Sequence, residues 1–131
     1  MKYLLMIYSN PASWEHPMFA RDPGFLALPE SERAELTRQA EDLRREITES
    51  GEFVAGSALA DPVTARSVRG RDGSPVTTDG PYIEAKEQLA GYFVLDCESL
   101  ERACEIAARF PDARFTGVEV RPIMDTAGQE M

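Results

Sequence analysis

The stretch Thr77–Asp96, TTDGPYIEAKEQLAGYFVLD, organises the interpretation of the whole chain. It begins with Asp79-Gly80-Pro81, a typical turn sequence. It continues into a strand predicted over Gly91–Cys97, which carries large apolar side chains on both faces. Such a pattern is typical of a strand that is covered on both sides of its sheet. Several ionisable groups precede this buried strand, namely Glu84, Lys86 and Glu87.

Two amphipathic helices are predicted from apolar spacing. The first spans Pro29–Ser50, where Pro29 suits the first helical position. Its apolar stripe repeats at intervals of four, three and four residues: Leu36, Ala40, Leu43 and Ile47. The second helix follows Ser99, a suitable N-cap, and is expected to stop at Pro111.

Strands account for most of the other ordered segments. Tyr3–Tyr8 is apolar on both faces, like Gly91–Cys97. Asp72-Gly73 is a strong hairpin signal. Further strands are predicted at Glu52–Ala58 and Phe115–Arg121, and the hairpin strands at Val63–Arg69 and Pro75–Thr78.

The order is therefore strand, helix, strand, hairpin, strand, helix, strand. Apart from the inserted β-hairpin, this is the split βαβ arrangement of a ferredoxin-like α+β fold with an antiparallel sheet. Two helices cover only one face of a four-stranded sheet, yet two strands are apolar on both faces. We therefore expect a homodimer that packs through the sheet face. The length of 131 residues predicts a single domain over 1–131.

Composition excludes several classes of function. The net charge is −9 and no basic patch stands out, so nucleic acid is not an expected partner. No segment has the length of a membrane span or signal peptide, and Cys97 and Cys104 form no CxxC pair, so we expect a cytoplasmic protein with reduced, partly buried cysteines. A single histidine and the absence of nucleotide motifs predict neither a metal nor a cofactor.

Residues 10–28 are predicted to form an irregular loop that is longer than usual. Prolines punctuate it, and its large apolar side chains should pack over another part of the molecule: Trp14, Phe19, Phe25 and Leu26. His16, the only histidine, lies in this loop and is a candidate catalytic residue, although a lone loop histidine is more often simply exposed. Trp14 is a candidate to line a pocket, with core packing as the alternative.

Asp79 is the first candidate for chemistry. Its simplest role is to stabilise the turn, because Asp-Gly-Pro is turn chemistry. The alternative is a general base in a cleft with apolar walls, where Tyr82, Phe93 and the loop aromatics would raise its pKa. Lys86 would then hold an anionic group, with Glu84 and Glu87 beside it. The alternative for these three is a solvated cluster or an ion pair across a dimer interface.

The motif Asp79–Gly91, DGPYIEAKEQLAG, closely resembles the signature of the YCII-related proteins, in the branch named for its DGPFAETKE motif. The resemblance extends to MKYLLMIY at 1–8 with Trp14, and to VEVRP at 118–122. It implies a dimeric α/β barrel built from two ferredoxin-like protomers. Three positions depart from the motif, at Tyr82, Ile83 and Ala85, and the loop after Trp14 is longer than is usual.

The resemblance implies no settled reaction. The YciI branch of the family uses a His on the first helix together with an Asp. Ala40 stands near that His position, so the His is not carried over, and Asp79 is carried over only as the Asp of the motif. Other members resemble partners of extracytoplasmic-function sigma factors by gene neighbourhood.

Two functional hypotheses follow. The first is a small-molecule site near the Asp79 turn, with cofactor-free acid–base chemistry if the protein is an enzyme. The second is a non-enzymatic regulatory or scaffold protein that binds a partner such as a sigma factor. Neither hypothesis specifies a substrate.

Overall fold

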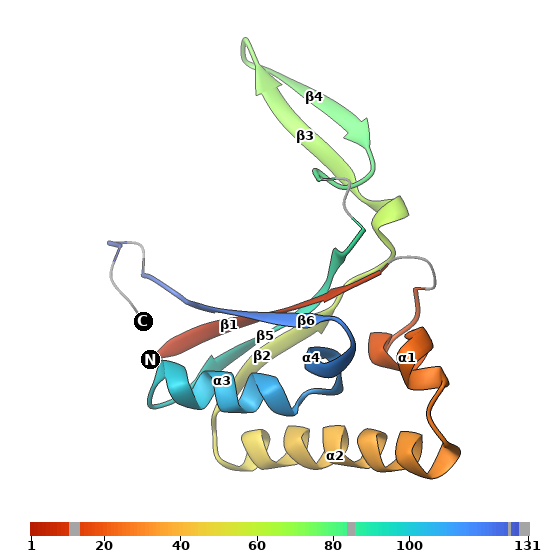
Figure 1. The fold of residues 1–131 in the computed structure, drawn as a ribbon. Coiled ribbons are helices and arrows are strands. Elements are labelled where there is room, and N and C mark those ends of the chain that lie inside the picture. The colour runs from red at the N-terminus through yellow and green to blue at the C-terminus, as the bar shows by residue number, and fades with distance from the viewer. Residues whose placement is uncertain (11–13, 84–85, 126, 129–131) are drawn as a thin grey trace.

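The fold is a four-stranded antiparallel sheet with helices on one face, in a computed structural model that describes residues 1–10, 14–83, 86–125 and 127–128 (Figure 1). The strand order is β2-β5-β1-β6. Because β5 separates β1 from β2, and β1 separates β5 from β6, the topology is the predicted ferredoxin-like split βαβ. The strands are β1 (Lys2–Ser9), β2 (Phe53–Ala58), β5 (Gln88–Asp96) and β6 (Gly117–Pro122).

Two helices, α2 (Glu30–Glu49) and α3 (Leu100–Arg109), cover the same face of the sheet (Figure 1). Ser99 is the N-cap of α3, as predicted, and its hydroxyl accepts a hydrogen bond from the backbone N–H of Arg102 at 3.1 Å. The hydrophobic core lies between these helices and the sheet. Its buried members are Tyr3, Leu5, Leu43, Ile47, Leu95, Cys97, Ala103, Ile106, Ala107 and Phe110.

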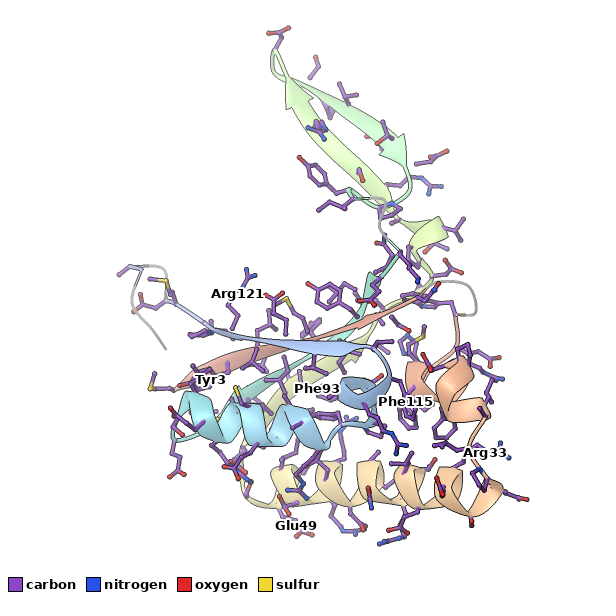
Figure 2. All side chains as sticks on the ribbon, in the orientation of Figure 1. Tyr3, Arg33, Glu49, Phe93, Phe115 and Arg121 are labelled. Atoms are coloured by element: carbon purple, nitrogen blue, oxygen red, sulfur yellow. The ribbon has the colours of Figure 1, made fainter. Side chains whose placement is uncertain are left out.

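None of the helices in the described residues lies on the opposite face of the sheet (Figure 1). Leu4 pairs with Val94, and Met6 with Tyr92, in the register of β1 and β5, so these four apolar side chains share that face. Figure 2 shows the contrast between the two sides, because Arg121 points away from the helices whereas Phe93 lies on the helix side. We call the side with these four residues the open face.

The hairpin of β3 (Arg66–Arg71) and β4 (Ser74–Asp79) forms a separate two-stranded sheet. Its turn is the predicted Asp72-Gly73, and both residues have positive φ, 50° and 76°. The hairpin extends beyond the end of the main sheet, on the side away from the helices (Figure 1). A short 3-10 helix, Pro62–Thr64, leads into it.

Some segments differ from the sequence-based prediction. The 10–28 loop is not wholly irregular, because it contains the 3-10 helix Met18–Arg21 and helix α1 (Pro23–Leu26). Helix α3 ends before Pro111, as predicted, but Pro111 also begins a short helix that was not predicted, α4 (Pro111–Phe115), since proline is well suited to the first helical position. Consequently β6 begins at Gly117 instead of Phe115.

Smaller differences concern element ends and exposure. β5 begins at Gln88, before the predicted Gly91, and Pro29 is the N-cap of α2 and not its first residue. Cys97 is buried as expected, but Cys104 is exposed on α3, and both are free thiols. No helix in the described ranges has the length and apolar character needed to cross a membrane.

Candidate functional site

A cavity of about 690 Å³ lies between α2, the helix side of the sheet and the loop that contains His16. One wall is formed by α2, and the opposite wall by the ends of β2 and β5. The segment at Phe110–Asp112 completes it. This volume lies within the range of sites that hold small organic molecules.

Small residues create the space. The walls contain Ala40, Gly56, Ala58, Ala90 and Gly91, so the helix and the sheet approach each other without side chains that fill the gap. The absence of a side chain at Gly56 is required by its neighbour, because a Cβ there would lie 2.7 Å from a ring carbon of Phe93.

Aromatic rings form the apolar floor. Phe93 stacks on Phe110 with ring centroids 5.0 Å apart and an interplanar angle of 21°. Phe53 packs edge-on against Phe93 at 5.9 Å. The guanidinium of Arg44 on α2 lies over both Phe53 and Phe93, at 4.9 and 5.2 Å from their centroids. A cation on the helix wall is therefore held above an aromatic surface.

Asp112 is the buried acid of the cavity. It lies in the first turn of α4, is only 7% exposed, and lines the cavity. Burial raises its pKa to about 6, and this effect outweighs the opposing influence of its own backbone N–H and of the nearby charge of His16. The pKa of Asp112 therefore lies close to neutral pH, where the carboxyl group can both accept and donate a proton.

His16 lines the same cavity from the loop. Its Nε2 lies 2.7 Å from the carbonyl oxygen of Leu59, and the indole Nε1–H of Trp14 donates to the same oxygen at 3.0 Å. A carbonyl oxygen only accepts hydrogen bonds, so Nε2 must carry the proton. The other imidazole nitrogen, Nδ1, is then the basic one. Leu59 itself is tied to β5, because its N–H donates to the carbonyl of Ala90 at 2.9 Å.

The loop also packs against α4 by ring contacts. Phe19 meets Phe25 edge-on at 5.3 Å, and Phe25 meets Phe115 at 5.8 Å. Phe19 and Phe25 are buried, as expected for a loop that packs over another part of the molecule, and so is Met18, but the expectation was wrong for Leu26, which is 51% exposed. This packing places the His16 segment beside Asp112.

The motif residue Asp79 does not line the cavity. It ends β4, its side chain is 90% exposed, and it pairs with Arg66 across the hairpin, Nε to Oδ1 at 3.1 Å. With this exposure, the described residues do not enclose Asp79 in the apolar walls that we considered for it. The turn itself is present, since Gly80 has a φ of 91° and its N–H donates to the carbonyl of Ala65 at 2.8 Å.

Three further candidates from the motif, Tyr82, Lys86 and Glu87, also lie outside the cavity, whereas Ala90 and Gly91 at the end of the motif line it. Tyr82 is exposed and packs under the guanidinium of Arg69 at 4.6 Å. Lys86 and Glu87 are exposed, and Glu84 lies outside the described residues. Of the candidates named from the sequence, His16 lines the cavity and Trp14 positions the carbonyl that His16 contacts.

Sequence reasoning missed Asp112. The available signal was the Pro-Asp pair at 111–112, which is typical of a first helical turn. This signal would have predicted the short helix, but not that the carboxyl group of Asp112 is buried. In the described part of the chain, no group of three or more His, Cys, Asp or Glu side chains is arranged to hold a metal ion.

The fold and this cavity place the protein among α+β proteins with a ferredoxin-like sheet and a pocket under its helices. Residues 1–127 match the YCII-related domain, and the chain belongs to that family. An uncharacterized protein of Rhizobium meliloti (strain 1021) is 32% identical over 99 residues, which are 74% of this chain and 80% of that protein.

Among solved structures, the chain resembles 5-chloro-2-hydroxyhydroquinone dehydrochlorinase from Burkholderia phenoliruptrix AC1100, in complex with 2,5-dihydroxybenzoquinone. The TM-score is 0.47 and the sequence identity 10%, over 98% of this chain and 100% of that one.

Proposed function

We propose that the cavity binds a small organic molecule and that Asp112, with His16, moves a proton to or from it without a cofactor. The observation that supports this most directly is the burial of a carboxyl group, with a pKa of about 6, in a cavity lined by aromatic rings. Perturbed acids inside clefts are the usual candidates for proton transfer.

The two groups would have complementary roles. Above about pH 6 the Asp112 carboxylate accepts a proton from a bound molecule, and below it the neutral acid donates one. His16 presents Nδ1 as a second base, because its Nε2–H is committed to the Leu59 carbonyl. The aromatic floor would exclude water and hold the apolar part of the substrate.

The test is ligand-dependent thermal stabilisation across a panel of small metabolites, at pH 5 and pH 8, for the wild type and Asp112→Asn. We expect a subset of ligands to stabilise the wild type, with a pH dependence that Asp112→Asn abolishes. Asp79→Asn is the matched control, because it makes the same change in an exposed carboxylate outside the cavity.

If Asp79→Asn removes the response and Asp112→Asn leaves it intact, the site lies at the motif turn, and the cavity proposal is wrong. If no ligand stabilises the wild type, the small-molecule function itself is wrong. Both carboxylate variants keep the size of the side chain, so gross misfolding is not the expected cause of a lost response.

We also propose that the chain is a member of the DGPF branch and a homodimer that forms a dimeric α/β barrel through the open face. The branch rests on the motif at 79–91 and the dimer on the four apolar side chains of the open face: Leu4, Met6, Tyr92 and Val94. An apolar sheet face is normally covered by a second layer.

A further inference from the structure

We infer that the cavity selects planar molecules that carry a negative charge, and that Arg44 is the group that binds this charge. The inference rests on the small-molecule function proposed above. It deepens that function by naming the class of ligand.

Arg44 differs from Arg38 and Arg45 of α2 in its partners, and from Arg33, whose Nε–H donates to the carbonyl of Leu28, in lining the cavity. Arg38 pairs with Glu35 and Asp42, and Arg45 pairs with Asp42. Within the described ranges, no carboxylate lies at ion-pair distance from Arg44, whose neighbours are the rings of Phe53 and Phe93. Its guanidinium therefore has N–H donors available at the cavity wall.

The surface beneath Arg44 favours a flat ligand. Phe93 and Phe110 are stacked, and both line the cavity together with Arg44. A planar ring can lie against this aromatic surface while its carboxylate, phenolate or enolate group reaches the guanidinium. Glu41, one turn before Arg44, also lines the cavity and would disfavour ligands with several negative charges.

The probes are naphthalene-2-carboxylate and its uncharged analogue naphthalene-2-carboxamide, titrated into the protein at pH 7.5 with amide NMR shifts as the readout. We expect the carboxylate to bind about tenfold more tightly, the difference made by one charge-assisted hydrogen-bonded pair. Arg44→Gln should remove this preference. Arg45→Gln is the matched control, because the guanidinium of Arg45 already pairs with Asp42 and does not line the cavity.

Equal affinities of the two probes for the wild type would overturn the assignment while leaving a small-molecule cavity in place. The assignment would also be overturned if Arg45→Gln lost the preference for the carboxylate probe as fully as Arg44→Gln does. The preference would then depend on the net charge of the protein and not on Arg44. If neither probe shifts the amides of the cavity, the ligand class is wrong, whereas the proposed function fails only if no metabolite of the panel stabilises the wild type.

A second observation concerns the hairpin. Its residues and base expose large apolar side chains, of which Val68 is 60%, Tyr82 65% and Ile83 66% accessible. A two-stranded hairpin is marginally stable alone in water, so a surface that covers these side chains would stabilise this one. We propose that this surface is the second copy of the chain, with the hairpin acting as an arm that grips the partner beside its open face.

The direction of the hairpin supports this occupant. It leaves the end of the main sheet on the side away from the helices, which is the side of the open face (Figure 1). A second sheet packed on the open face would therefore lie next to the hairpin. Charge agrees, because the two hairpin strands contain three arginines and one aspartate in a chain of net charge −9.

The test places the photoreactive residue p-benzoylphenylalanine at position 68 and uses mixed samples of isotope-labelled and unlabelled protein. We expect cross-links between differently labelled chains that map to β1, β5 or β6. The control position is Leu26, which is 51% exposed on α1 at the helix side. A sample that sediments as a dimer but cross-links only within one chain overturns the arm, and a sample that sediments as a monomer overturns the dimer too.

Discussion

The Nε2 atom of His16 lies 2.7 Å from the carbonyl oxygen of Leu59, so a loop residue is fastened to the end of β2. This contact fixes both the position and the tautomer of the only histidine in the chain. It also holds His16 on the wall of the cavity that contains Asp112.

His16→Ala should raise the pKa of Asp112 further. The positive charge of protonated His16 lowers the pKa of Asp112, although burial has the larger opposite effect. Without the imidazole, one of the effects that lower the pKa of Asp112 is gone, and the effect of burial, which raises it, is larger by comparison. The measurement is the titration of the Asp112 carboxyl carbon by NMR in both proteins. An unchanged titration would show that the two groups do not interact, and a lowered pKa would show that His16 shields Asp112 from water.

Asp112→Asn should change how stability depends on pH. The folded-state pKa of about 6 exceeds the ordinary value of 3.8, so the folded protein binds this proton more tightly than the unfolded chain. The stabilisation is complete below about pH 4 and is lost as the pH rises through 6. By pH 8 the ionised carboxylate costs about 3 kcal/mol, the equivalent of two pKa units.

Denaturant unfolding between pH 4 and pH 8 tests this. The charged groups that face Asp112 across the cavity are His16 from the loop and Glu41 and Arg44 from α2, and they are present in both proteins. The asparagine variant should lose less stability than the wild type over this interval, whereas Asp79→Asn should follow the wild type. Identical pH profiles for Asp112→Asn and the wild type would mean that Asp112 is not buried as described.

The fold was predictable because it depends on local patterns. Apolar residues on both faces of Tyr3–Tyr8 and the stripe on α2 identify the strands and helices that build the sheet and its cover. The cavity depends instead on contacts between distant segments. Phe25 brings the loop to Phe115 of α4, and no local periodicity encodes that contact. The burial of Asp112 was therefore not visible in the sequence.

The motif residue Asp79 differs from Asp112, because the sequence suggested it as a site residue and the structure places it outside the cavity. Asp79 was conspicuous in the sequence. In the structure it pairs with Arg66 across the hairpin, and its side chain points into the solvent at the base of the hairpin. Its local conformation was predicted correctly, because Gly80 takes the positive φ that the turn requires. A role for Asp79 in a ligand site stays a prediction.

Arg102→Ala should destabilise the fold. The guanidinium of Arg102 donates two hydrogen bonds to the Glu52 carboxylate, from Nε at 2.9 Å and from Nη2 at 3.0 Å, in a half-buried position between α3 and the beginning of β2. Loss of this bidentate partner should cost about 2 kcal/mol at pH 7. Arg45→Ala removes an exposed pair and should cost at most about 0.5 kcal/mol.

The same pair sets a second, opposite pH dependence. The hydrogen bond from Arg102 holds the pKa of Glu52 below its ordinary value, so its stabilisation is present above pH 4.5 and is lost as the pH falls. In Arg102→Ala the loss of stability on acidification should be smaller than in the wild type. Urea unfolding at pH 3 and pH 7 measures both effects, and equal costs at the two pH values would contradict the pairing.

Gly91→Ala should be destabilising although alanine is small. A Cβ at this position would lie 2.9 Å from the backbone oxygen of Ser57 on the adjacent strand, and a backbone atom cannot turn aside as a side chain can. The strands must separate locally, at a cost of about 1–3 kcal/mol. Gly70→Ala in β3 is the control, because its Cβ would meet nothing within 4 Å. Thermal unfolding should show a clear drop for the first variant only.

Val94→Glu should prevent the proposed dimerisation. Val94 lies at the centre of the open face opposite Leu4, and a carboxylate there would be buried without a partner when two such faces meet. In the monomer the same side chain is partly exposed, so the variant should still fold. Sedimentation equilibrium should give a dimer for the wild type and a monomer for Val94→Glu. Leu26→Glu, an equal change on the exposed surface of α1, should remain dimeric. A wild type that sediments as a monomer at every concentration would refute the dimer, and a dimeric Val94→Glu would place its interface elsewhere.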